Sequence, residues 1–219
     1  MINFKNADGA FHYYMNQILT FGENFDDTKA LFNVGFTIKN PMDNVIHDGL
    51  RTRNWKQEYA EAEWQWYLSG DRNIKRLGEI YGKVPEIWRH MADENGNVNS
   101  NYGWQWERNK QLANVIAMLK SNPNTRQAAI SIYNGKEIND GNYQYDTPCT
   151  YAVQFTILKG KLNMAVVMRS NDLWYGFCND QYCFSKLQNL VADKVGIEVG
   201  TYYHYAHNLH LYNNIIEKL

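Results

Sequence analysis

Residues 150–172 read TYAVQFTILKGKLNMAVVMRSND and contain the clearest structural signal in the chain. Two runs rich in β-branched and apolar residues, 151–158 and 162–168, flank the short turn KGK. A glycine in a short loop between two such runs is typical of a β-hairpin. The stretch therefore predicts two antiparallel strands, the first beginning just after Cys149 and the second ending just before Arg169.

The rest of the chain predicts helices and further strands, and no repeat, low-complexity stretch or linker divides it. Gly22, Gly70 and Gly196 follow three helical segments as stop signals. Asp8 is expected to cap the first helix. Most predicted strands lack the alternation of apolar and polar residues that marks a sheet with one exposed face. Together with the helices, they predict an α+β fold in which helices cover a mixed sheet. We expect one domain of residues 1–219. The expected strands are 30–39, 127–133 and 199–205, and the expected helices are 8–19, 56–69, 109–120, 177–195 and a last one from 211.

Composition and charge exclude several classes of function. The 219 residues are 44% apolar with a net charge of −1, so no global basic field is available to grip a nucleic-acid polymer. Three cysteines without a CxxC pair predict neither a disulfide framework nor a metal site. We find no signal-peptide pattern and no apolar run near the ~20 residues of a membrane span. We therefore expect a cytoplasmic protein that binds no membrane.

Cys149 has two interpretations. It lies in the segment DTPCT, residues 146–150, directly before the first strand of the hairpin. Taken alone, such a cysteine is more often a small buried apolar residue than a nucleophile. A strand entrance can also present a thiol to a cleft, and a reactive thiolate needs positive charge nearby. The choice therefore depends on where the arginines lie.

Two arginines are expected near the start of this strand. Arg169, followed by Ser170, comes directly after the hairpin, and Arg126 opens the strand predicted before it. A guanidinium group binds phosphate through a planar fork, and a serine adds a hydroxyl donor. Strand-end arginines are more often solvated, but adjacent strands would bring Arg126 and Arg169 close to Cys149. The pattern is consistent with a phosphate site beside the thiol.

Other polar positions also allow a structural or a functional role. Glu63 lies among aromatic residues on a predicted helix, either as a solvated carboxylate or as a desolvated acid–base group. Asp180 interrupts the apolar start of the longest predicted helix. Its carboxylate either caps the N-terminus of this helix or points into a site. His210 and Tyr212 suit contacts with hydroxyl groups, although an isolated histidine is more often a core residue. Tyr102 lies in a turn signal.

Taken in order, these pieces resemble the thymidylate synthase family. The ordered set covers roughly residues 60 to 214 and is far more specific than any single member. The matching segments are Glu63-x-x-Trp66-Tyr67-Leu68-x-Gly70-x-x-Asn73-Ile74, Trp88, Ala92-Asp93-Glu94-Asn95-Gly96, Tyr102-Gly103, Arg126, Pro148-Cys149, Gln154-Phe155, Arg169-Ser170-x-Asp172, Gly176 and His210-x-Tyr212. The resemblance implies the thymidylate synthase fold, homodimerisation through a sheet face, and a nucleoside monophosphate substrate with 5,10-methylenetetrahydrofolate as co-substrate.

The resemblance also implies catalytic and folate-binding roles. Cys149 resembles the nucleophile that adds to C6 of the pyrimidine. Glu63 resembles the carboxylate that orders water and relays protons, and Tyr102 resembles the residue that assists loss of the C5 proton. Trp88 and Asp172 resemble folate contacts.

Substrate contacts are implied at further matching positions. Arg169 and Ser170 resemble phosphate ligands, and Arg126 resembles an arginine donated across a homodimer interface to the partner's site. His210 and Tyr212 resemble the pair that holds the 3′-hydroxyl of the sugar. Gln127 stands where the family usually has a second phosphate-binding arginine. The candidates that could supply the missing positive charge are Lys29, Arg51 and Arg53.

One departure from the family concerns the base. Synthases read uracil with an asparagine that lies eleven residues after the phosphate-binding arginine, and here that residue is Asp180. An amide accepts from N3–H of uracil and donates to O4, whereas an ionised carboxylate only accepts. Facing cytosine, the carboxylate accepts from the N4 amino group and shares a proton with N3. Asp180 therefore predicts a cytosine nucleotide, unless a shift of one residue puts Asn179 there and restores uracil.

Other departures resemble the viral deoxycytidylate hydroxymethylases of this family. The segments NSNYGW at 99–104 and MRSND at 168–172 are similar to theirs, and Thr150 stands where synthases carry histidine. In those relatives water, rather than hydride from the folate, traps the exocyclic methylene intermediate. The resemblance implies a dCMP 5-hydroxymethyltransferase of viral DNA modification that makes 5-hydroxymethyl-dCMP and releases tetrahydrofolate.

Three alternatives stay open at this point. The first is methyl transfer to dCMP with hydride transfer from the folate, and the second is a thymidylate synthase that acts on dUMP. The third is a nucleotide-binding protein without catalysis, against which the retained Cys149, Glu63 and Tyr102 argue.

Overall fold

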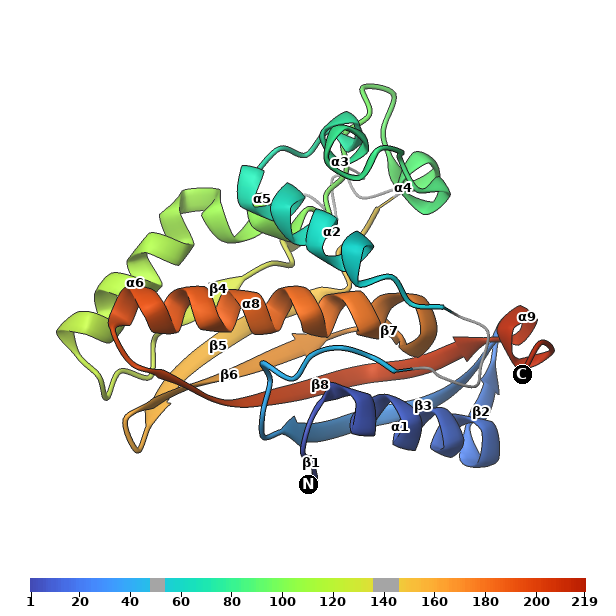
Figure 1. Cartoon of the computed structure of the whole chain (residues 1–219), viewed down its shortest axis with the longest axis horizontal. Helices are drawn as coiled ribbons and strands as arrows, with labels where there is room; N and C mark the ends of the chain where they lie inside the picture. The colour runs from blue at the N-terminus through green and yellow to red at the C-terminus, as the bar shows by residue number, and fades with distance from the viewer. Residues whose placement is uncertain (48–53, 136–145) are drawn as a thin grey trace.

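A computed structural model describes residues 1–47, 54–135 and 146–219 of the chain (Figure 1). Within these residues, eight strands form one mixed sheet with the order β1-β3-β8-β6-β5-β4, while β2 pairs with β3 and β7 pairs with β8. The strands are β1 Ile2–Phe4, β2 Glu23–Phe25, β3 Thr28–Ile38, β4 Ala129–Ser131, β5 Thr150–Leu158, β6 Lys161–Met168, β7 Asn171–Asp172 and β8 Glu198–Tyr212.

Helices lie between these strands along the chain and confirm the predicted α+β class. They are α1 Ala7–Phe21, α2 Gln57–Ser69, α3 Ile74–Tyr81, α4 Glu86–Met91, α5 Tyr102–Glu107, the 3₁₀ helix η1 Arg108–Lys110, α6 Gln111–Ser121, the π-helix η2 Leu173–Phe177, α8 Cys178–Val195 and α9 Asn213–Ile216. Helix α1 packs on β3, and α8 packs on β6 and β8 (Figure 1).

The predicted hairpin is confirmed as β5 and β6. Its loop has two residues, Lys159 and Gly160, both with positive φ (52° and 74°), and Leu158 pairs with Lys161 across it. Two central residues with positive φ match the right-handed twist of the flanking strands. The pairing of Thr150 with Met168 at the other end brings the residues before β5 beside those after β6.

Three local predictions are wrong. The strand expected to end at 205 continues as β8 to Tyr212, because residues 202–212 pair along most of β3, and this pairing replaces the helix expected from 211. The strand expected at 127–133 is the shorter β4. Asn6 rather than Asp8 caps α1, since its Oδ1 accepts from the Gly9 amide (3.1 Å), while Asp8 accepts from the His47 amide (2.7 Å).

The two faces of the sheet differ in burial. On one face a row of paired positions, Val153, Val166, His204 and Phe36, is at most 1% exposed. The adjacent row of the opposite face contains Ala152, Val167 and Tyr205, which all remain partly exposed although they lie on central strands. The helices thus cover the first face, and the second keeps apolar and aromatic surface open.

Candidate active site

The hairpin places Arg169 beside Cys149, as predicted. The Arg169 amide donates to the Cys149 carbonyl (2.8 Å), and Nη2 lies 3.7 Å from the Cys149 Sγ. The guanidinium group also donates to the carbonyls of Pro148 (3.1 Å, from Nε) and Thr147 (2.7 Å, from Nη2). These bonds fix a positive charge against the loop that carries the thiol.

The surroundings of Cys149 work against ionisation of its thiol. Burial raises the pKa of Cys149 to about 11, Arg169 lowers it, and the carboxyl groups of Asp180, Asp146 and Asp172 raise it further. The thiol is therefore protonated at neutral pH in the single chain. A nucleophilic role requires additional positive charge near Sγ or neutralisation of one of these carboxyl groups.

Tyr102 lies close to the thiol because two helices approach closely. A Cβ on Gly103 would lie 1.6 Å from the Tyr67 carbonyl oxygen, so only glycine allows α5 to cross α2 here. The Tyr102 ring packs 5.6 Å from that of Tyr67, measured between centroids. Burial raises the pKa of Tyr102, and the charges of Asp180 and Cys149 raise it further, so these three groups share one site.

The structure separates Asp180 from its neighbour Asn179. Both ends of the Asn179 amide are engaged, since Oδ1 accepts from Trp55 Nε1 (2.8 Å) and Nδ2 donates to the Tyr175 carbonyl (3.2 Å). Asp180 instead affects the pKa of Cys149, and its Oδ2 accepts from Asn171 Nδ2 (2.8 Å). It caps no helix, so the capping interpretation of Asp180 is wrong, and the carboxyl group lies in the site.

The Asp180 carboxyl group can change its protonation near neutral pH. Burial raises its pKa to about 7, the hydrogen bond from Asn171 lowers it, and the charge of Asp172 raises it. The residue keeps partial exposure, as a side chain that faces a ligand must. A carboxyl group that can either hold or release a proton at neutral pH is typical of functional sites.

Glu63 lies on α2 and is 4% exposed, so it is desolvated rather than a solvated helix-face residue. Its Oε1 accepts from the Tyr59 hydroxyl (2.9 Å), whose oxygen accepts from Trp88 Nε1 (2.8 Å). Glu63 and Asp180 both raise the pKa of Tyr67, behind the effect of burial. Sequence reasoning missed Tyr59, although its spacing of four residues from Glu63 on one helix places both on the same face.

The predicted residues in and next to β7 and β8 lie near Cys149 or near Arg169. Asp172 pairs with His210 between β7 and β8, and its Oδ1 accepts from two backbone amides, those of Trp174 (2.8 Å) and Tyr175 (3.2 Å), at the start of η2. Burial lowers the pKa of His210, and nearby Arg169 lowers it further. Burial raises the pKa of Tyr212, to which Asp172, Asp27 and Cys149 add. Ser170 lies between Arg169 and β7 and is partly exposed.

Arg126 lies elsewhere in the chain. It lines a hollow with Gln154, Thr156 and Leu158, near the end of β5 that is opposite to Cys149. At about 3.3 Å per strand residue, the two ends of β5 lie roughly 25 Å apart. The expectation that adjacent strands bring Arg126 close to Cys149 is therefore wrong within one chain.

The candidates for additional phosphate charge do not reach the thiol in what the structure describes. Lys29 donates from Nζ to the Leu19 carbonyl (2.8 Å). Arg51 and Arg53 lie outside the described residues. Gln127 is exposed before β4.

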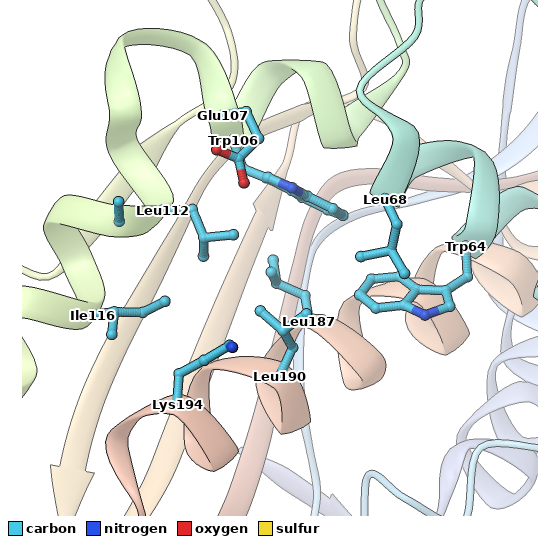
Figure 2. A pocket seen from close by; sticks show the side chains of 10 residues that line it. Trp64, Leu68, Trp106, Glu107, Leu112, Ile116, Leu187, Leu190 and Lys194 are labelled. Atoms are coloured by element: carbon cyan, nitrogen blue, oxygen red, sulfur yellow. The ribbon is translucent and has the colours of Figure 1, made fainter.

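An apolar hollow of about 280 Å³ lies among the helices, and Figure 2 shows the side chains that line it. Glu107 and Lys194 are its charged residues. It contains none of the predicted site residues, so it is separate from the site around Cys149. Its lining consists of Trp64, Leu68, Trp106, Glu107, Leu112, Ala113, Ile116, Leu187, Leu190 and Lys194.

The described residues contain neither a metal-binding cluster nor a membrane-spanning helix. No group of three or more histidine, cysteine, aspartate or glutamate side chains in residues 1–47, 54–135 and 146–219 could hold a metal ion. No helix in the same part of the chain is long and apolar enough to cross a membrane.

A strand-end thiol held against an arginine and surrounded by desolvated acid–base groups is typical of enzymes that use covalent nucleophilic catalysis. The family model described as thymidylate synthase matches residues 10–219, and the chain belongs to the thymidylate synthase family. Members of this family are one-carbon transferases and use methylenetetrahydrofolate as co-substrate. The fold is similar to that of thymidylate synthase from T4 phage, with 24% identity, a TM-score of 0.77, and coverage of 94% of this chain and 77% of that chain.

Proposed function

We propose that the protein is a deoxycytidylate 5-hydroxymethyltransferase, which converts dCMP, methylenetetrahydrofolate and water into 5-hydroxymethyl-dCMP and tetrahydrofolate. The observation that carries the proposal is the position of Asp180. Its carboxyl group lies with Cys149 and Tyr102, whereas both ends of the neighbouring Asn179 amide are bonded elsewhere.

A carboxyl group that holds its proton on the oxygen facing N3 suits cytosine better than uracil. When protonated it donates to N3 of cytosine, and its other oxygen accepts from the N4 amino group. The pKa of about 7 allows this proton to be present at neutral pH. Uracil offers a donor at N3 and an acceptor at O4, which is the reverse pattern. A matched pair of bonds to a base edge gives about 1–3 kcal/mol of discrimination.

The proposed reaction begins at the thiol. Cys149 gives its proton to the water that Glu63 orders and Sγ adds to C6, while N3 takes a proton from Asp180 as charge builds up on the base. C5 then takes the one-carbon unit that methylenetetrahydrofolate supplies, and Tyr102 assists loss of the C5 proton. This proton and the one from Cys149 end on the released tetrahydrofolate, and N3 returns its proton to Asp180. Water then adds its hydroxyl to the exocyclic methylene group, and the Sγ–C6 bond breaks as the remaining proton of the water restores the thiol.

The Thr150 hydroxyl lies beside the reacting groups. It is fully buried next to Cys149, and its side-chain hydrogen bond lowers the pKa of Tyr102. We assign to this hydroxyl the contact with the water that adds to the exocyclic methylene group.

Substrate groups around the base are assigned to the strand residues. Arg169 and Ser170 bind the phosphate, and His210 and Tyr212 hold the sugar 3′-hydroxyl. This assignment is supported by the electrostatic influence of Arg169 on both Cys149 and His210.

The folate is assigned to Trp88 and Asp172. Trp88 is partly exposed and its ring is fixed by the bond to Tyr59, so it offers a flat surface for an aromatic ring system. Asp172 is fixed by its bonds to the first turn of η2 and adds a carboxyl group. When bound, the folate supplies the one-carbon unit.

A homodimer completes the phosphate site in this proposal. The partly exposed sheet face around Val167 and Tyr205 forms the interface, and Arg126 reaches the site of the partner. The distance of Arg126 from its own Cys149 supports this assignment, because an arginine at the far end of β5 has no access to its own site.

The test is a paired assay with dCMP or dUMP and methylenetetrahydrofolate, read by product mass and by dihydrofolate absorbance. We expect 5-hydroxymethyl-dCMP without dihydrofolate. A methylated product with dihydrofolate, or turnover of dUMP alone, would overturn the proposal. Cys149→Ala should abolish release of tritium from C5 of dCMP, whereas Cys178→Ala, a buried cysteine that bonds to the Leu173 carbonyl, should retain it. Tritium release by Cys149→Ala would refute the nucleophile.

A further inference from the structure

A chain of buried hydrogen bonds leads from β8 to Asp180. The Tyr202 hydroxyl lies 3.1 Å from His204 Nδ1, and His204 Nε2 lies 3.0 Å from Asn171 Oδ1. Asn171 Nδ2 then lies 2.8 Å from Asp180 Oδ2. Tyr202, His204 and Asn171 are at most 2% exposed. We call these three residues the donor chain.

The buried Tyr202 hydroxyl fixes the direction of these bonds. Among the described residues His204 is its only hydrogen-bond partner, and a buried hydroxyl proton without an acceptor is costly. Tyr202 therefore donates to Nδ1. Burial lowers the pKa of His204 to about 3, so the ring is neutral and carries its single proton on Nε2. His204 donates to Asn171 Oδ1, which turns the amide nitrogen of Asn171 toward Asp180.

The surrounding packing holds the donor chain in this arrangement. The His204 ring stacks on Phe36 at 5.0 Å and meets the edge of Phe177 at 5.3 Å. A Cβ on Gly176 would lie 3.2 Å from both Asn171 Nδ2 and Asp180 Oδ2, so the backbone of η2 closes over this last bond. Asn171 has little room to present its oxygen to Asp180 instead.

We propose that the donor chain determines the choice between cytosine and uracil, because it keeps the proton of Asp180 on Oδ1 and leaves Oδ2 as an acceptor that faces the exocyclic group at C4. This inference rests on the proposed function. Tyr202, His204 and Asn171 act as positioning residues, since they reach the base only through Asp180.

The reason is that a protonated carboxyl group could pair with either base. For cytosine, Oδ1–H donates to N3 and Oδ2 accepts from the N4 amino group. For uracil, the proton would have to move to Oδ2 and be donated to O4, while Oδ1 accepts from N3–H. The Asn171 amide points its own hydrogen at Oδ2 and opposes a proton there. The donor chain thereby removes the protonation state of Asp180 that fits uracil.

The experiment compares kcat/KM for dCMP and dUMP in variants of the donor chain. In Tyr202→Phe and His204→Phe the bond direction is no longer fixed, and we expect the dCMP/dUMP ratio to fall about fivefold or more. His204→Gln should restore much of the ratio, because its amide can accept from Tyr202 and donate to Asn171. Tyr14→Phe is the matched control, since Tyr14 is buried 4.8 Å from Phe36 but lies outside the donor chain, and its ratio should stay unchanged.

The outcomes separate the two proposals. A wild-type enzyme that prefers dUMP refutes the proposed function itself. A wild-type enzyme that prefers dCMP, together with a Tyr202→Phe ratio equal to that of Tyr14→Phe, overturns the donor chain alone. Tyr202→Phe removes one oxygen and keeps the ring, so it also tests the inference if the His204 variants do not fold.

Discussion

Two series of hydrogen bonds end on carboxyl groups in the candidate site, and they are built differently. The donor chain belongs to strands and is buried over its whole length before it reaches Asp180. The second series runs from Trp88 through Tyr59 to Glu63 and belongs to helices. We call it the helix-side series. It begins at a partly exposed ring on α4, a helix of six residues.

The difference suggests a division of labour between a fixed and an adjustable carboxyl group. Asn171 on β7 is held by His204 of the central strand β8, whose ring packs between aromatic rings, so the donor to Asp180 has one position, which suits the reading of a base edge. Tyr59 on α2 is held by Trp88 of the short helix α4, so the donor to Glu63 can shift when a ligand covers Trp88, which suits the handling of protons and water. In this hypothesis substitutions in the donor chain change the preference between cytosine and uracil, and substitutions in the helix-side series change kcat.

Removal of the Glu63 charge should have the largest effect. We expect Glu63→Gln to lower kcat with dCMP by about 10²–10⁴-fold, the usual contribution of a general acid–base group, with the dCMP/dUMP ratio unchanged. Glu61→Gln is the matched control on the same helix, since Glu61 bonds to Tyr182 and Lys186 outside the site, and its kcat should change little. A changed base ratio in Glu63→Gln would contradict the division.

Asp180→Asn should reverse the base preference. We expect the dCMP/dUMP ratio of kcat/KM to fall by about 100-fold, because an amide suits uracil. The pH dependence should change as well. Wild-type kcat/KM for dCMP should fall as pH rises through about 7, where Asp180 loses the proton that N3 needs, and this decline should be absent from the variant. An unchanged ratio would show that Asp180 does not read the base.

Tyr59→Phe should have the smallest effect. Loss of its bond to Glu63 should lower kcat by about tenfold or less, with the base ratio retained. Tyr81→Phe is a suitable control, because Tyr81 lies on α3 and its ring packs 5.2 Å from that of Tyr59. Steady-state assays of Tyr59→Phe and Tyr81→Phe with dCMP and dUMP give kcat and the base ratio, which are then compared with those of Tyr202→Phe. A loss of base preference in Tyr59→Phe would mean that the two series are not separate.

Local signals predicted the parts of the fold that depend on neighbours in the chain. The hairpin of β5 and β6 follows from two apolar runs and a glycine turn, so its bounds differ from prediction by about one residue. The end of β8 could not be predicted in this way, because it depends on pairing with β3, as in the pair Thr28 and Tyr212, which are far apart in the chain. The bulged start of α8, the π-helix η2, likewise has no strong local signal.

The site shows the same limit. Cys149 and Arg169 were predictable as neighbours because one hairpin joins them. The choice between Asn179 and Asp180 was not, since it depends on Trp55, more than 120 residues away in sequence. Sequence reasoning missed Tyr202 and His204 as well. Their spacing of two along a strand puts both on one face, but only the fold reveals that Asn171 completes the series.

The burial of His204 and Asp180 in one network has a consequence for acid stability. Folding moves the pKa of Asp180 up from 3.8 to about 7 and that of His204 down from 6.5 to about 3. From about pH 4 to about pH 6.5 the unfolded chain holds one proton on the His204 imidazole, and the folded chain holds one on the Asp180 carboxyl group. Because the two states bind the same number of protons at these groups, the two groups together do not change the free energy of unfolding with pH in this range. Replacing the imidazole should expose the carboxyl contribution alone: in His204→Phe, relative to wild type, the urea midpoint should fall as pH rises from 5 to 8. The folded protein has in effect relocated one proton from a base to an acid without changing its net charge, and a midpoint difference that does not vary with pH would refute this.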